Sequence, residues 1–158
     1  MWYVLLIAAL IGVDQLVKLL VVRNFELFES LELWNFIHLT YIHNTGAAFG
    51  MMEGARVLFL IFNIVLVAAV LWAWKKPWMG RYKFAVSLIV AGALGNCIDR
   101  IFRGYVVDFI DFTYWPVFNV ADIAVVCGTI LLSIMILTAK EEELPVFGKD
   151  KKKEKTKK

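Results

Sequence analysis

The stretch GALGNCIDR (residues 92–100), followed by VVDF (106–109) and FNVAD (118–122), determines how the rest of the chain is interpreted. It places three carboxylates, two carboxamides and an arginine among apolar residues. A charge at the centre of a bilayer costs about 2.5–3.5 kcal/mol on insertion scales, and charges kept there usually have partners and a function. We therefore expect the functional site in this region.

The composition around this stretch is that of a membrane protein. The chain has 158 residues, 61% of them hydrophobic, whereas a soluble domain is nearer to half apolar. The formal charge of +3 is unevenly placed, because seven lysines lie among residues 149–158. This basic tail predicts a disordered cytoplasmic end near anionic lipid, not a nucleic-acid-binding surface. Cys97 and Cys127 lie in apolar runs and predict no disulfide framework.

Four apolar runs predict four transmembrane helices, at about 2–22, 57–74, 84–100 and 118–139. They form one membrane domain, residues 1–140, followed by the basic tail at 141–158. The loop at 75–83 carries four positive charges and no acid, so the positive-inside rule places it in the cytoplasm. An even number of spans then puts both termini there. The polar groups of spans one, three and four meet near the outer surface.

The segment between the first two spans, residues 23–56, is too polar to cross a membrane. Alternation and aromatic residues over 31–41 predict strands, and thus a small extracytoplasmic sheet at the membrane surface. The predicted fold is an all-α polytopic membrane protein with this one β-rich element. His38 and His43 are five residues apart, which on a regular strand places them on opposite faces and argues against a shared metal site.

Residues 44–50 read NTGAAFG and have the composition of a tight turn, because Gly46 and Gly50 permit positive φ. The Asn44 carboxamide and the exposed backbone are equally suited to binding an extended peptide. In the first span, Asp14 and Lys18 lie four residues apart on one helical face. They are interpreted as an internal ion pair, as a polar face turned toward the active site, or as both.

Carboxylates are the best candidates for chemistry, because Ser87 and Ser133 lie deep in spans with no histidine near them and no phosphate-binding loop is present. Two neighbouring carboxyl groups can share a proton and act as base and acid, as in aspartic proteases. The candidates are Asp99, Asp108, Asp111 and Asp122. Arg100 follows Asp99 and favours a permanently ionised, structural role for it. Apolar neighbours of Asp108 predict a raised pKa. These arguments rank the pair of Asp108 and Asp122 only modestly above Asp99 and Asp122.

Together with DQxxK (14–18) and NTGAAFG (44–50), the three blocks of 92–122 resemble the signature of the prolipoprotein signal peptidases, also called signal peptidase II. Each block is short, but the five in this order are specific. The resemblance implies a four-helix aspartic endopeptidase of the bacterial inner membrane. Its substrates are diacylglyceryl-modified prolipoproteins, cut just before the lipidated cysteine at the outer face of the membrane.

The resemblance also implies roles for individual residues. Asp108 and Asp122 match the catalytic aspartates, while Ile123 departs from the small hydroxyl residue commoner there. The remaining matches support the site or bind substrate: Asp14, Lys18, Asn44, Gly46, Asn96, Asp99, Arg100 and Asn119. No metal, cofactor or nucleic acid is implied. The expected partners are prolipoprotein substrates and membrane lipids, and we expect a monomer.

Two other classes of protein share some of these sequence features, a small transporter and a non-enzymatic scaffold. A small proton-coupled transporter also carries intramembrane acids and cations. Against it, the acids gather at one surface and no inverted repeat is visible. A non-enzymatic membrane scaffold leaves the buried charges unexplained.

Overall fold

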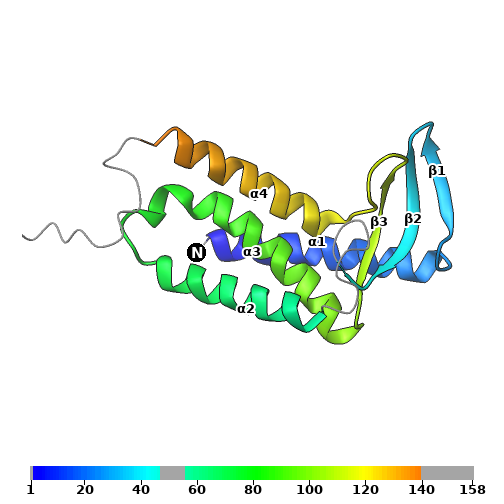
Figure 1. Ribbon diagram of the computed structural model, residues 1–158, viewed down its shortest axis with the longest axis horizontal. Helices are drawn as coiled ribbons and strands as arrows, with labels where there is room; N and C mark the ends of the chain where they lie inside the picture. The colour runs from blue at the N-terminus through cyan, green and yellow to red at the C-terminus, as the bar shows by residue number, and fades with distance from the viewer. Residues whose placement is uncertain (1, 47–55, 140–158) are drawn as a thin grey trace, which may run out of the picture.

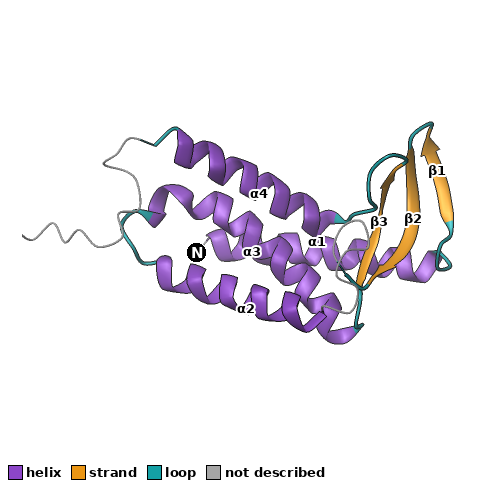
Figure 2. Cartoon of the chain, in the orientation of Figure 1, coloured by secondary structure: helices purple, strands orange, loops and turns teal. Residues whose placement is uncertain are grey.

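Four helices and a small sheet make up the computed structural model, which describes residues 2–46 and 56–139. The helices are α1 (Trp2–Asn24), α2 (Arg56–Ala73), α3 (Met79–Phe102) and α4 (Val120–Leu137). The strands are β1 (Ser30–Trp34), β2 (Ile37–Asn44) and β3 (Val106–Phe112). The helices form an elongated bundle and the sheet stands across one end of it (Figures 1 and 2). The predicted fold class is confirmed.

The helices are built for lipid. By length and composition α1, α3 and α4 are able to cross a membrane, and the apolar helix at Val57–Ala73 is shorter. Large apolar side chains are exposed along them, such as Leu5, Leu16, Ile64 and Ile130. Such a surface is unfavourable in water and is the expected one in a bilayer, where the helix satisfies its own backbone groups.

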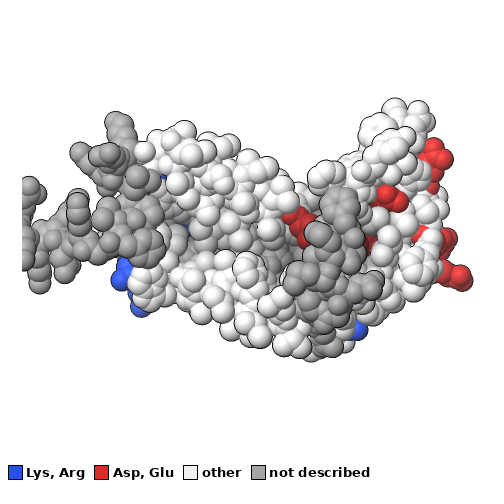
Figure 3. All heavy atoms as spheres, in the orientation of Figure 1, with Lys and Arg blue, Asp and Glu red and all other residues white. Residues whose placement is uncertain are grey.

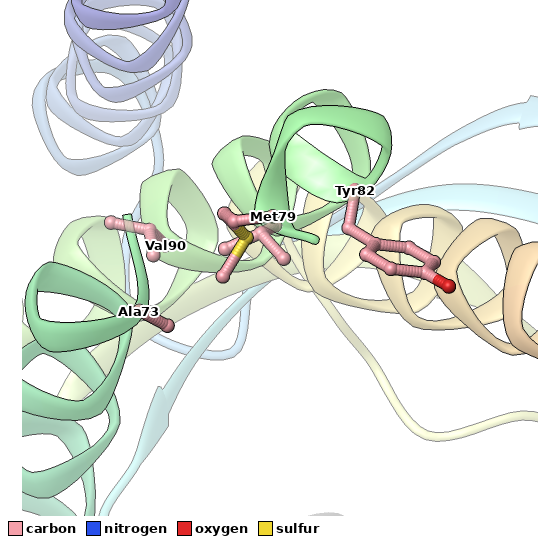
Figure 4. Close-up of a cluster of buried hydrophobic side chains, with 5 residues drawn as sticks. Ala73, Met79, Tyr82 and Val90 are labelled. Carbon is pink, nitrogen blue, oxygen red and sulfur yellow. The ribbon is translucent and has the colours of Figure 1, made fainter. Parts of the chain in front are cut away.

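Helix α3 is the centre of the bundle and the most buried of the spanning helices. Small residues let α4 approach it closely, because a Cβ on Gly92 would collide with the Ala121 carbonyl. A Cβ on Gly128 would lie 2.7 Å from the Ala85 carbonyl oxygen. At the end of the bundle away from the sheet, apolar side chains of α2 and α3 form a core cluster: Ala73, Met79, Tyr82, Val86 and Val90 (Figure 4).

The sheet is antiparallel throughout, in the order β1-β2-β3. Residues 101–117, between the third and fourth predicted spans, are not all loop, since β3 lies within them and completes the sheet. The backbone of Phe118 pairs with the other edge of β3 at Ile110. Two aspartates in VVDFIDF interrupt its apolar pattern, and its partner β2 is far away in the sequence. The interrupted pattern and the distant partner are the two reasons why the strand is not predicted from its own sequence.

Two further predictions need correction. The basic segment 75–83 is not all loop, because α3 begins at Met79 and includes Arg81 and Lys83. The two histidines do not lie on opposite faces, because β2 has a register shift between Leu39 and Ile42. His38 pairs with Asp111 and His43 with Val107, and these partners are four residues apart on β3. Both histidines therefore face the same side. The predicted tail at 141–158 and residues 47–50 lie outside the described residues.

Candidate active site

The polar residues singled out from the sequence meet where the sheet joins the bundle. Asp108 comes from β3, Asp122 from the first turn of α4, and Asn44 from the end of β2. Helix α3 adds Asn96 and Asp99, and α1 adds Asp14 and Lys18. Most are almost inaccessible to solvent. The elements that carry them are far apart in sequence, so the site depends on the whole fold.

Asp108 is 2% exposed and both of its carboxylate oxygens accept hydrogen bonds from carboxamides. Asn119 Nδ2 donates to Oδ1 at 2.6 Å, and Asn44 Nδ2 donates to Oδ2 at 2.8 Å. Burial, and then the nearby charge of Asp122, raise the pKa of Asp108 to about 7, although the two amide donors oppose this. Near neutral pH this carboxyl group is therefore able both to give and to take a proton.

Asp122 is held by the N-terminal cap of α4. The side-chain oxygen of Asn119 accepts from Asp122 N at 3.0 Å, and Asp122 Oδ2 accepts from Asn119 N at 3.1 Å, which forms a capping box. Asn96 Nδ2 donates to the other carboxylate oxygen at 2.8 Å. Asn119 thus contacts both aspartates, because its Nδ2 also reaches Asp108. One helix cap fixes the pair relative to each other.

Each of the three carboxamides around the pair has its oxygen held by a donor. The Asn44 oxygen accepts from Gly46 N at 3.0 Å, and the Asn119 oxygen from Asp122 N. The Asn96 oxygen accepts from Lys18 Nζ at 2.9 Å and from Asn119 Nδ2 at 3.1 Å. All three amide nitrogens consequently point at the carboxylates. These contacts fix the orientation of both carboxylates.

A cluster of buried charges lies behind this pair. Lys18 Nζ is 2.9 Å from Asp14 Oδ2 and 2.9 Å from Asp99 Oδ2, and Arg103 is 2.7 Å from the other oxygen of Asp99. Asp14 Oδ1 accepts from Ala121 N at the start of α4, and Asp99 Oδ2 from Val107 N of β3. The cluster joins α1, α3, α4 and β3. Asp14 and Lys18 form the ion pair predicted from their spacing, and the pair also supports the site.

Arg100, predicted from the sequence as the cation beside Asp99, is the wrong partner: the cations that contact Asp99 are Lys18 and Arg103. Arg100 does not pair with Asp99, because consecutive helical residues point about 100° apart, whereas Arg103 lies four residues on and shares its face. Arg100 instead donates to Gly46 O at 3.3 Å, and its guanidinium lies 4.7 Å from the centre of the Phe59 ring. Sequence reasoning missed Arg103 and Phe59, although the Asp99–Arg103 spacing was a usable signal.

Other candidates lie apart from the pair. Asp111 accepts from the Thr40 hydroxyl at 2.6 Å on the opposite face of the sheet from Asp108. Ile123 is exposed and points away from the polar cluster, which accommodates its departure from the common residue. Within residues 2–46 and 56–139, no group of three or more acidic, histidine or cysteine side chains is placed to hold a metal ion.

A buried and a partly buried carboxyl group that share an amide partner, at the end of a bundle of membrane-spanning helices, are the arrangement of a membrane aspartic peptidase. A family model described as signal peptidase (SPase) II matches residues 6–138 of the chain. The lipoprotein signal peptidase of Halothermothrix orenii is 43% identical over 134 residues, which cover 84% of this chain and 92% of that protein. The chain therefore belongs to the signal peptidase II family.

Further comparisons agree. The lipoprotein signal peptidase of Lactococcus lactis subsp. lactis is 44% identical over 142 residues, covering 86% of this chain and 95% of that protein. A solved structure of a bacterial membrane enzyme superposes with a TM-score of 0.83 at 32% identity, covering 93% of this chain and 94% of that one. The family and enzyme class predicted from the sequence are confirmed: the protein is a multi-pass aspartic endopeptidase.

Proposed function

We propose that the protein removes the signal peptides of diacylglyceryl-modified prolipoproteins, with Asp108 and Asp122 as its catalytic pair. The observation that carries this assignment is Asn119, which donates to Asp108 and caps Asp122 within one hydrogen-bonded unit. Cleavage takes place just before the lipidated cysteine. One chain supplies both aspartates, so a monomer is sufficient for activity.

The position of the pair suits such a substrate. A scissile bond beside a lipid anchor lies at the bilayer interface, and the pair lies at the end of the spanning helices. Lysine and arginine side chains gather at the opposite end of the bundle (Figure 3), where the positive-inside rule favours the cytoplasm. We infer that the sheet and the pair face outward in a bacterial inner membrane. An impermeant thiol reagent should then label Glu29→Cys and not Lys76→Cys in intact cells.

The chemistry follows from a pair that carries one proton. The ionised carboxylate takes a proton from a water molecule as that water attacks the scissile carbonyl carbon. The protonated partner donates to the carbonyl oxygen. Collapse of the tetrahedral intermediate breaks the C–N bond, returns a proton to the departing amine of the lipidated cysteine and leaves a carboxylic acid on the signal peptide. No covalent enzyme intermediate forms.

Surrounding residues support this chemistry without carrying it. Asn44, Asn96 and Asn119 present amide N–H groups to the carboxylates and hold them at a fixed separation. Arg100 fixes the chain after β2 through Gly46 O, next to the Asn44 amide. Asp14, Lys18 and Asp99 hold the helices and β3 together. Side chains fixed in this way need no rearrangement when charge develops in the transition state.

Cleavage of a lipid-modified precursor by the purified protein in detergent tests the proposal. Asp108→Asn and Asp122→Asn should each lower kcat by a factor on the order of 10² to 10⁴, the usual contribution of a general acid or base. Asp111→Asn is the matched control on the same strand and should retain activity. Near-normal turnover by Asp108→Asn would refute the assignment, and so would loss of activity with Asp111→Asn alone. An intact wild-type protein that left the precursor uncut and passed protons across vesicles would favour a transporter.

A further inference from the structure

The sheet has two chemically different faces, which follow from its register. Residues directly opposite each other on antiparallel strands point to the same side, and residues two apart on a strand do as well. One face carries Ser30, Glu32, His38, Thr40 and Asp111, in which Ser30 bonds Thr40 and Thr40 bonds Asp111. The other carries Leu31, Trp34, Ile37, Leu39, Ile110 and Phe112. Asp108 lies on this second, apolar face.

The apolar face ends in a cluster of aromatic residues where the strands turn. This aromatic tip consists of residues 33–37, at the turn from β1 to β2, and residues 112–118, from the end of β3 onward, and neither segment contains a charged residue. The two segments are joined, because Thr113 N donates to Phe36 O and the rings of Phe36 and Phe112 are 6.5 Å apart. The tip is therefore one structural unit.

The aromatic tip exposes its rings. Trp34 is 69% exposed, Phe36 is 53% and Tyr114 is 95%. In Figure 1 the β1–β2 hairpin projects beyond the near end of α4, to the side of the bundle. Helix α4 exposes a stripe of apolar side chains along one helical face: Ile123, Val126, Ile130 and Ile134. Acidic side chains are visible at the sheet end of the molecule (Figure 3), and Glu26, Glu29 and Glu32, in and just before β1, are exposed.

We propose that the aromatic tip and the adjoining apolar face of the sheet rest on the lipid of the outer leaflet and anchor the sheet at the membrane interface. Three observations meet here: exposed aromatic rings beside an apolar sheet face, absence of charge from the tip, and an exposed apolar stripe on α4, which begins at Val120 directly after the tip. Tryptophan and tyrosine favour the headgroup level of a bilayer, because their rings are apolar with a polar tip. The sheet then holds Asp108 at a fixed depth.

Nitroxide labels measure this contact directly. In a Cys97→Ala and Cys127→Ala background, single labels are placed at Trp34→Cys and Tyr114→Cys, and on the polar side at Ser30→Cys and Glu32→Cys. The protein is reconstituted in vesicles of phosphatidylglycerol and phosphatidylcholine. Collision rates are then compared for oxygen, which concentrates in lipid, and for a water-soluble nickel complex. The ratio of oxygen to nickel collisions should be several-fold higher at 34 and 114 than at 30 and 32.

The other outcomes overturn the proposal. Equal ratios at all four positions would place the tip in water. Spin–spin broadening at position 34 would make the surface a contact between two copies of the chain. A lipid-like ratio that appears only after a lipid-modified precursor is added would make it a substrate surface. A variant that loses helical circular dichroism is replaced by Phe36→Cys. The same readings in an Asp108→Asn background keep the test independent of catalysis.

Discussion

Removing the Lys18 ammonium should be among the most damaging single changes outside the proposed catalytic pair. Lys18 is 0% exposed and its ammonium contacts Asp14, Asp99 and Asn96, each at 2.9 Å. Lys18→Met keeps an unbranched stem as long as the lysine methylene chain, lacks the ammonium, and leaves two buried carboxylates without this cation. Breaking a buried ion pair by removing one partner costs about 3–5 kcal/mol. Asp99 keeps Arg103, so most of the loss arises at Asp14.

Unfolding in detergent, followed by circular dichroism, measures that loss. Lys83→Met is the matched control, since Lys83 lies over the Trp74 ring at 5.3 Å, a contact worth about 1 kcal/mol. Lys18→Met combined with Asp14→Asn should recover part of the stability, because the second change removes the unpaired charge. Equal losses for the two lysine variants, or a double variant less stable than Lys18→Met, would refute the reasoning.

The same substitution should alter catalysis in the molecules that remain folded. Without the ammonium, the Asn96 oxygen keeps only the Asn119 amide as a donor, so the Asn96 nitrogen is held less firmly against Asp122. The charge of Lys18 also lowers the pKa of Asp108. Its removal should raise that pKa further, so the pH profile of kcat should move to higher pH. A change in stability with an unmoved profile would leave Lys18 a purely structural role.

Three other predictions follow from the geometry. Asp108→Asn should make the stability of the protein less dependent on pH. Because the pKa of Asp108 is raised to about 7, the native state binds this proton more tightly than the unfolded chain does. The wild type should therefore lose stability as pH rises from about 4 to 7. Unfolding midpoints at several pH values test this, and identical slopes in the two proteins would contradict it. Asn119→Ala should cost about 1 kcal/mol of helix cap and shift the pH profile of kcat upward. Asn119→Ser should keep the cap but show the same shift, because neither variant keeps the donor to Asp108; equal unfolding midpoints for the two variants, or an unmoved profile in either, would contradict this. Gly95→Ala should cost about 1–3 kcal/mol of stability and reduce turnover, because its Cβ would lie 2.8 Å from Asp14 Oδ2. Gly12→Ala should not destabilise the protein, because nothing lies within 4 Å of its Cβ. Thermal unfolding compares the two variants, and similar midpoints would contradict the packing argument.

The helices were predictable because each apolar run has the length of a bilayer and needs no partner to be recognised. The sheet was only half predictable, since β3 becomes a strand by pairing with β2, and VVDFIDF carries two aspartates within it. Spacing identified the pair of Asp14 and Lys18 correctly. It did not identify the partners of Asp99, because adjacency in sequence was used where the helical repeat of i and i+4 decides the contact.

Local reasoning ranked the proposed catalytic pair, Asp108 and Asp122, only modestly above Asp99 and Asp122. Asp99 and Asp108 are both buried aspartates near apolar residues, and they differ in what surrounds them in space. Asp99 has two cations within 2.9 Å, whereas Asp108 has two carboxamides, and most of these partners are far away in the sequence. The ordered blocks were therefore needed for a firm choice of Asp108.

Strand β2 has one extra residue between Leu39 and Ile42, so the geometry of the site depends on the number of residues in this strand. With a regular ladder, Ile110 opposite Leu39 would place Tyr41 opposite Asp108, and Asn44 would turn to the polar side of the sheet. Because of the shift, Asn44 lies opposite Val106 and donates to Asp108. Deleting one residue at Thr40 or Tyr41 would preserve the strand but reverse the side on which the following peptide emerges. Length variation should therefore be tolerated in the β1–β2 turn and eliminated by selection between Leu39 and Asn44.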